Sequence, residues 1–189
     1  VPPIHPTSTF TQVSPGKHKG FEYARSGNPT RLGLEKALAS LEGGAAGACF
    51  ASGSAATACV FATLSPGDKV LAYSDVYGGT FRLLKRVFEG FGIVPVFTDD
   101  PSVNSFSKLA DAKTKLVWIE SPTNPLLRCL DIAAIAKVAH GVGARLAVDN
   151  TIATPALQLP LALGADYVVH STTKYIGGHS DVIGGVLIC

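Results

Sequence analysis

Strand-length apolar runs separated by helix-length segments constrain the fold of this 189-residue chain more than any other feature. Three of them, Leu116–Ile119, Arg145–Val148 and Tyr167–His170, lack the polar alternation of a strand that has one face in water. Strands of this kind belong to parallel sheets, whose two faces are covered by the connecting helices. The sequence therefore predicts an α/β fold with a mostly parallel sheet covered by helices.

The same alternation runs through the earlier part of the chain. Strands are predicted over residues 48–50, 69–73 and 93–97, and helices over residues 32–42, 55–64, 80–89 and 131–140. Pro95 places the third of these strands at an edge or an end of the sheet, because proline cannot donate a ladder hydrogen bond. Gly43 and Gly44 mark the end of the first helix.

Residues 1–30 differ from the rest, being rich in Pro, Gly, Ser and Thr with little periodicity. They are predicted to form an extended N-terminal arm, with residues 31–189 as the main domain. Val1 begins within an extended proline-rich segment, and the apolar strand at residues 185–189 stops before a turn. We therefore expect the chain to be a fragment of a longer polypeptide.

Composition excludes several classes of function. The formal net charge of +2 is spread without any block of like charge, which argues against nucleic acid and against a membrane surface as partners. The longest apolar run is too short for a membrane span, and the N-terminus is no signal peptide, so the expected compartment is the cytoplasm. The four cysteines lack ligand spacing and are expected to be reduced thiols, with no metal site.

Polar residues gather where the predicted strands end. Four such places are Ser52–Ser54, Glu120–Asn124, Asp149 and Ser171–Lys174. Ligands of parallel sheets bind beyond the carboxyl ends of the strands, so these four loops are expected to converge on one cleft.

The residue types in these loops suit one cofactor. A lysine just after a buried strand, such as Lys174, can lose part of its hydration and attack an aldehyde. Asp149 can hold a protonated ring nitrogen, and the hydroxyls of Ser171 and Thr173, with the helix start at Ser52–Ser54, can bind a phosphate. An amine, a carboxylate and a phosphate site are what pyridoxal phosphate needs from a protein.

Each of these residues also has an ordinary structural interpretation. Lys174 alone reads as a solvated lysine, Asp149 as the cap of the following loop, and Tyr77 as a half-buried core residue. Ser171 with Lys174 also matches the Ser-x-x-Lys pattern of serine acyltransferases, but that pattern requires a core helix start and a Lys-Thr-Gly strand. The histidines show no metal spacing and are expected to be structural.

Taken together, the motifs match a known family in its order and over nearly the whole chain. The matching stretches are Tyr23–Thr30, Ala51–Ala56, Asp75–Thr80, Glu120–Pro125, Asp149–Thr151, His170–Tyr175 and Gly178–Asp181. The chain resembles the Cys/Met-metabolism PLP enzymes, the group that contains the cystathionine lyases and synthases and the homoserine sulfhydrylases.

The resemblance implies a large domain like that of aspartate aminotransferase (PLP transferase type I). Lys174 would form a Schiff base with pyridoxal 5'-phosphate, and Tyr77 would stack on the cofactor and serve as an acid and a base. These two residues are the implied catalytic residues. The implied cofactor-binding residues are Tyr23, Arg25, Gly53, Ser54, Tyr77, Asn124, Asp149, Thr151, Ser171, Thr173 and Lys174.

Within that set, the resemblance assigns separate parts of the cofactor. Asp149 would bond the ring nitrogen and Asn124 would face the ring oxygen, while the phosphate would be held by Gly53, Ser54, Ser171 and Thr173. Ser54 departs from the family, which usually has Met there, but the backbone amide at this position does the binding.

Tyr23 and Arg25 would complete the phosphate site of a neighbouring subunit, which implies a homodimer and usually a tetramer. Members of the family are about twice as long as this chain, and the arginine that binds the substrate carboxylate lies in the part absent here.

The implied substrate is a small amino acid. We expect a cystathionine γ-lyase that forms cysteine, 2-oxobutanoate and ammonia; cystathionine γ-synthase is the close alternative and cystathionine β-lyase follows. Gly79 argues against methionine γ-lyase, which places a cysteine there. The interpretation from a different class is a non-catalytic fragment that keeps the cofactor fold.

Overall fold

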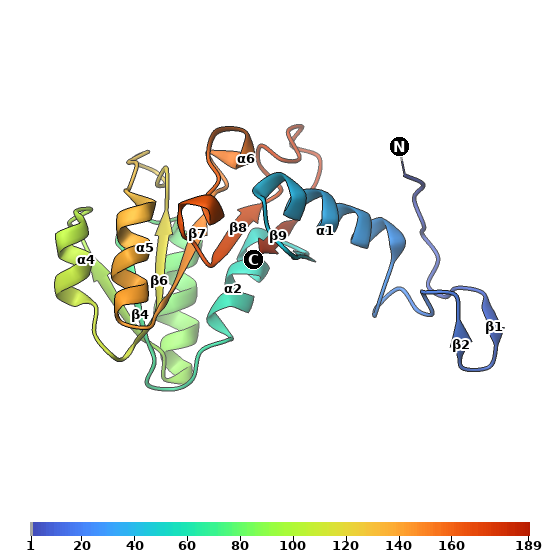
Figure 1. The fold of residues 1–189 in the computed structure, drawn as a ribbon, viewed down its shortest axis with the longest axis horizontal. Coiled ribbons are helices and arrows are strands. Elements are labelled where there is room, and N and C mark those ends of the chain that lie inside the picture. Colours follow the sequence, from blue (N-terminus) through green and yellow to red (C-terminus); the bar gives the residue numbers. More distant parts are fainter. Residues whose placement is uncertain (1) are drawn as a thin grey trace.

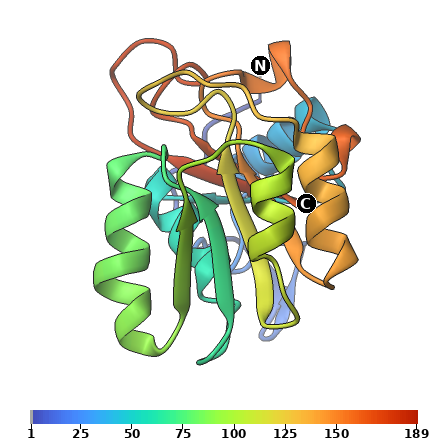
Figure 2. The ribbon, with the colours of Figure 1, turned by 90° about the vertical axis from the view of Figure 1, so that its left-hand side faces the viewer.

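A computed structural model describes residues 2–189 and contains a seven-stranded sheet with helices on both faces (Figures 1 and 2). The strands lie in the order β3-β9-β8-β7-β6-β4-β5. Their bounds are β3 Gly47–Phe50, β4 Lys69–Tyr73, β5 Val94–Thr98, β6 Thr114–Glu120, β7 Arg145–Asp149, β8 Tyr167–Ser171 and β9 Gly185–Ile188. The helices are α1 Pro29–Glu42, α2 Gly53–Phe61, α3 Gly78–Arg82, α4 Val103–Leu109, α5 Ile132–Gly141 and α6 Thr154–Leu157.

The sheet is mostly parallel, which confirms the predicted fold class. Strands β5, β4, β6, β7 and β8 pair in parallel, and only β9 runs antiparallel to its neighbours β3 and β8. Strand β5 lies at the edge of the sheet, where Pro95 was predicted to place it.

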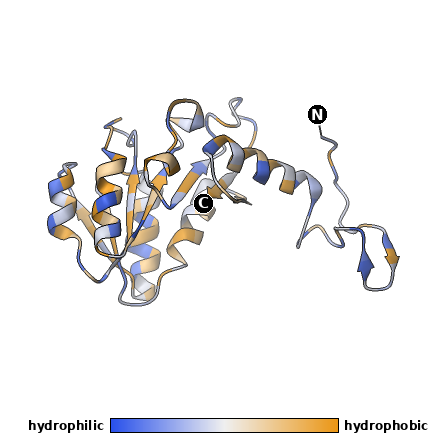
Figure 3. Cartoon of the chain, viewed as in Figure 1, coloured by the Kyte–Doolittle hydropathy of each residue, from blue (hydrophilic) through white to orange (hydrophobic). Residues whose placement is uncertain are grey.

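Because side chains alternate along each strand, the central strands contribute to two hydrophobic cores, one on each face of the sheet. On one face, Val117, Leu146 and Val148 pack in the core that includes α5. On the other face, Trp118 and Ala147 pack against apolar residues of α2 and of the segment after α3. All five side chains are fully buried, and Figure 3 shows hydrophobic colour along the central strands.

Helix ends follow the local sequence signals. The Ser52 side chain accepts a hydrogen bond from the Ala55 amide at the start of α2, and Asp131 does the same for α5. Helix α1 ends at Gly43, whose φ of 73° is in the left-handed region that glycine tolerates best.

The helix predicted over residues 80–89 needs correction, and helices α4 and α6 were not predicted. The helix predicted over residues 80–89 is α3 followed by a π-helical segment, η1 (Leu83–Phe88), and a 3₁₀ turn, η2 (Glu89–Phe91). An apolar pattern over so few residues does not separate a period of 3.6 from a wider one. Helix α4 was not predicted, because seven residues give too few turns for a periodic signal.

Residues 2–28 lie away from the sheet and connect to it through α1 (Figure 1). They contain a small hairpin of β1 (Gln12–Ser14) and β2 (Lys17–His18), which was not predicted. Residue 1 of the predicted arm lies outside the described residues. Helix α1 begins at Pro29, so the predicted boundary after residue 30 falls in its first turn. Contact of this segment with a neighbouring subunit stays a prediction.

Within residues 2–189, no helix combines the length and apolarity that crossing a membrane requires.

Candidate active site

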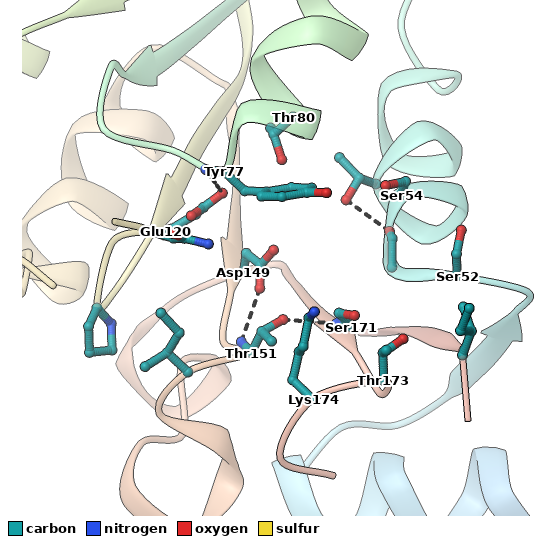
Figure 4. A pocket seen from close by; sticks show the side chains of 16 residues that line it. Ser52, Ser54, Tyr77, Thr80, Glu120, Asp149, Thr151, Ser171, Thr173 and Lys174 are labelled. Atoms are coloured by element: carbon teal, nitrogen blue, oxygen red, sulfur yellow. Dashed lines mark hydrogen bonds between the residues drawn. The ribbon is translucent and has the colours of Figure 1, made fainter. Parts of the chain in front are cut away.

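A cavity of about 230 Å³ opens at the carboxyl ends of the parallel strands. Figure 4 shows its lining side chains, which come from four strand ends and from the first turns of α2 and α3. The lining residues are Ser52, Gly53, Ser54, Thr57, Tyr77, Thr80, Glu120, Pro122, Asn124, Asp149, Thr151, Ile152, Ser171, Thr173, Lys174 and Ile183. The four loops predicted to converge therefore do so.

The structure brings together most of the predicted site residues. The ones that line this cavity are Gly53, Ser54, Tyr77, Asn124, Asp149, Thr151, Ser171, Thr173 and Lys174. Tyr23 and Arg25 do not line it. Their side chains stack on each other in the N-terminal segment, with the guanidinium carbon 5.0 Å from the ring centroid.

Hydrogen bonds between the ends of β7 and β8 fix the floor of the cavity. The Thr151 amide donates to Asp149 Oδ1 at 3.0 Å, and the Ser171 amide donates to Thr151 Oγ1 at 2.8 Å. The loop-capping role that the sequence allowed for Asp149 is thus present, and the same carboxylate lines the cavity (Figure 4).

One side of the cavity is built from the start of α2. Gly53 packs so closely on Ser171 that a Cβ at position 53 would lie 2.8 Å from the Ser171 Cβ atom. A larger residue there would push the helix start away from the strand end. The first amides of α2 and the hydroxyls of Ser54 and Ser171 together suit an anion, because a helix N-terminus carries partial positive charge.

Lys174 lies in the turn that follows β8, and its amine points into the cavity in Figure 4. The Thr173 hydroxyl accepts a hydrogen bond from the Gly184 amide at 3.1 Å, which ties the lysine turn to the segment before β9. A wider, more open cavity adjoins the first one and shares Thr173 and Lys174 with it. The lysine amine is thus reachable by a second molecule.

Tyr77 lies across the cavity from Lys174, with Asp149 between them (Figure 4). Its ring is 47% exposed, so it is not the core residue that the sequence also allowed. The Tyr77 amide donates to Glu120 Oε1 at 2.8 Å. A Cβ at Gly79 would lie 2.2 Å from the Tyr77 ring, so the absence of a side chain at Gly79 gives that ring its place.

Two carboxyl groups, Glu120 and Asp149, share the buried end of the site. Burial, and after it the charge of Asp149, raises the pKa of Glu120 to about 8. Burial also raises the pKa of Asp149, while the hydrogen bonds from Thr151 and the field of His170 lower it. Burial therefore favours the neutral form of both groups, and a cation placed beside Asp149 would favour its charged form.

Sequence reasoning placed Glu120 in one of the four converging loops but gave it no role in the site. The signal was available, because Glu120 ends an apolar strand in the same way as Asp149. Thr57 and Thr80 gave no signal, since threonine inside an Ala-rich or Gly-rich helix start reads as ordinary helix.

An amine, a buried carboxylate and an anion site on one cavity define the site of an enzyme that uses an aldehyde cofactor with a ring nitrogen and a phosphate. Residues 1–189 match the family described as Cys/Met metabolism PLP-dependent enzyme. The chain belongs to this family, whose cofactor is pyridoxal phosphate.

Relatives of this chain carry several names. A cystathionine gamma-synthase of Mycobacterium bovis is 52% identical over 190 residues, which cover 98% of this chain and 48% of the relative. A cystathionine beta-lyase of Coxiella burnetii is 49% identical over 187 residues, with the same shares. The chain thus spans about half the length of the curated relatives it matches.

A solved structure of cystathionine gamma-lyase from Lactobacillus plantarum, complexed with L-serine, superimposes with a TM-score of 0.94. It is 47% identical, and the match covers 98% of this chain and 49% of that chain.

Proposed function

We propose that this chain forms the cofactor-binding part of a cystathionine γ-lyase, a PLP-dependent enzyme that splits cystathionine. Cystathionine γ-synthase is the closest alternative and cystathionine β-lyase the next, since relatives with these names are about equally similar to the chain. The observation that carries the chemistry is the convergence of Lys174, Asp149 and Tyr77 on one cavity.

The residues present fit the cofactor. In this proposal Lys174 attaches it covalently through the Nζ amine, and Asp149 pairs with its ring nitrogen. The phosphate is held by the α2 start with Gly53, Ser54, Ser171 and Thr173, a cradle that a Cβ at Gly53 would fill. Asn124 faces the ring oxygen, and Thr151 holds the Asp149 carboxylate in place.

When bound, pyridoxal phosphate supplies an electron sink for carbanions formed next to it. Lys174 Nζ would take the α proton of the substrate and return it one carbon further along. The Tyr77 hydroxyl, on the opposite side of the cavity, moves a proton as the sulfur group leaves. The balance is cystathionine plus one water giving cysteine, 2-oxobutanoate and ammonia.

The proposed assembly is a homo-oligomer, at least a dimer and in the fuller form a tetramer. Tyr23 and Arg25 are proposed to reach the phosphate of a neighbouring subunit, which agrees with their position outside their own cavity. The proposed compartment is the cytoplasm, a reducing environment that suits Cys49, Cys59, Cys129 and Cys189, all free thiols.

The test is a product assay on the complete natural polypeptide with cystathionine. Cleavage at the γ carbon releases cysteine and 2-oxobutanoate, whereas cleavage at the β carbon leaves the sulfur on homocysteine and releases pyruvate. Formation of cystathionine from cysteine and an activated homoserine would identify the synthase. Absence of turnover in these assays and with every other sulfur amino acid would leave the non-catalytic alternative.

A further inference from the structure

A buried polar network lies on the face of the sheet opposite the candidate active site. Strand alternation places Glu120, Asp149 and Ser171 on the face of α2, with Trp118, Ala147 and Val169. A residue adjacent to each of these three, after Glu120 and Asp149 and before Ser171, therefore belongs to the other face. These three residues are Ser121, Asn150 and His170.

All three meet in one set of hydrogen bonds. His170 Nε2 lies 2.5 Å from Glu42 Oε1, and Asn150 Nδ2 donates to the same oxygen at 2.8 Å. The Gln158 side chain donates to Asn150 Oδ1 at 2.9 Å and to the Ser121 carbonyl at 2.6 Å.

The burial of the Glu42 carboxylate is the feature of this network that apolar packing does not explain. It is the last residue of α1, its side chain is 1% exposed, and His170 is equally buried. A buried carboxylate costs several kcal/mol of desolvation, so its retention needs a compensating role. Glu42 Oε2 and His170 Nδ1 have no partner within the described part of the chain, so the network is not a fully satisfied core cluster.

The network restrains the turn that carries Asp149. The Asn150 side chain is hydrogen-bonded to Glu42 and Gln158, and the Asn150 backbone amide donates to the Val169 carbonyl at 2.9 Å. Asp149 and Thr151 flank it on the chain and are hydrogen-bonded to each other. A shift of Asn150 therefore moves the carboxylate that faces the cavity.

The network also acts on Asp149 through its charge. The field of His170 lowers the pKa of Asp149 against the larger effect of burial. The His170 ring can keep its orientation only while Glu42 accepts its Nε2 hydrogen.

We propose that Glu42, through His170 and Asn150, is a positioning residue that places the Asp149 carboxylate from the opposite face of the sheet. This inference rests on the proposed function, because the readout is the seating of the cofactor against Asp149. Glu42 does not line the cavity, so an effect on the cofactor would have to pass through the strand ends, and the proposed route is the one through Asp149.

The test is a double-mutant cycle on the complete polypeptide, read by pyridoxal phosphate affinity and by the visible circular dichroism of the bound cofactor. Glu42→Gln keeps the size and one acceptor oxygen but removes the charge. We expect the dissociation constant to rise about tenfold, as for the loss of one charge-assisted hydrogen bond. In an Asp149→Asn background, Glu42→Gln should change the dissociation constant for pyridoxal phosphate by less than about twofold.

Glu35→Gln is the matched control, because Glu35 is also on α1 and accepts a hydrogen bond from the Cys49 amide, with no link to the site. It should leave cofactor affinity unchanged. Unfolding of each cofactor-free variant is followed in parallel, and His170→Asn replaces Glu42→Gln in the cycle if that variant does not fold.

An equal effect of Glu42→Gln in both backgrounds would show a purely structural role and overturn the inference. If Glu42→Gln changed neither the affinity for pyridoxal phosphate nor the dichroic band in protein that retains Asp149, the inference would be overturned as well. Failure of the unaltered protein to bind pyridoxal phosphate would instead overturn the proposed function, and it is seen before any variant is made.

Discussion

The sheet region and the N-terminal segment hold their candidate functional residues in opposite ways. Asp149 and Ser171 end strands whose central side chains are buried, and hydrogen bonds through Thr151 join these two strand ends. Lys174 lies in the turn after the second strand. Tyr23 and Arg25 lie on a segment with exposed apolar residues such as Ile4, which is 82% exposed. The sheet-borne residues thus meet in one cavity of this chain, whereas Tyr23 and Arg25 lie outside it and are proposed to act on a neighbouring subunit.

The largest expected contrast is in stability. Phe61 is fully buried and packs edge-on against Trp118 and Phe88, so Phe61→Ala should lower the free energy of unfolding by about 3–5 kcal/mol. Val13→Ala, in β1 at 68% exposure, should change it by less than about 0.5 kcal/mol. Denaturant unfolding measures both, and similar losses at the two positions would break the comparison.

The next prediction concerns Asp149. Asp149→Asn keeps the shape but removes the charge proposed to face the ring nitrogen, an interaction worth roughly 3–4 kcal/mol at an effective dielectric of 20. Steady-state kinetics should show kcat lowered by roughly 10²–10³-fold. Asp131→Asn is the control, because asparagine caps α5 as well as aspartate does. A fall of similar size in that control would point to general damage.

Burial of Glu120 gives a prediction for pH. Its pKa of about 8 lies above the unfolded value of 4.5, so the folded protein binds the proton more tightly. The stability this contributes is complete below the unfolded pKa and is lost as pH rises through the folded pKa. Glu120→Gln, which keeps the acceptor for the Tyr77 amide, should reduce that loss in the cofactor-free protein by on the order of 2 kcal/mol between about pH 5 and pH 9. Parallel pH profiles of unfolding for both proteins would contradict this.

The smallest predicted effect tests whether the N-terminal segment serves a second subunit. Arg25→Ala should weaken pyridoxal phosphate binding about tenfold, the loss expected for one exposed phosphate contact. Its activity should return in part when it is mixed with Lys174→Ala protein, because one site of each hybrid dimer then has both residues. A mixture of Lys174→Ala with Asp149→Ala is the control and should stay inactive. Equal behaviour of the two mixtures would place Arg25 on its own subunit's site.

Much of this arrangement could be predicted from the sequence, because its signals are local. Ser52 and Asp131 indicate helix starts, and Gly43 indicates a helix end. Asp149 and Lys174 indicate where apolar strands end. Their meeting in one cavity follows from the geometry of parallel strands.

The buried network could not be predicted in this way. Glu42 hydrogen-bonds to Asn150 and His170, which lie 108 and 128 positions further along the chain. In the sequence, its place just before Gly43 is typical of a solvated residue at a helix end. Alternation along the strands placed Asn150 and His170 opposite the site, but only the packing of α1 shows which group they meet.

The central claim is that the Lys174 amine binds the cofactor covalently. Borohydride reduction of the purified protein after addition of pyridoxal phosphate, followed by peptide mass spectrometry, tests it most directly. The account predicts one pyridoxyl group on Lys174, and none at that position in Lys174→Ala protein. Colourless protein with no label on Lys174 would contradict it.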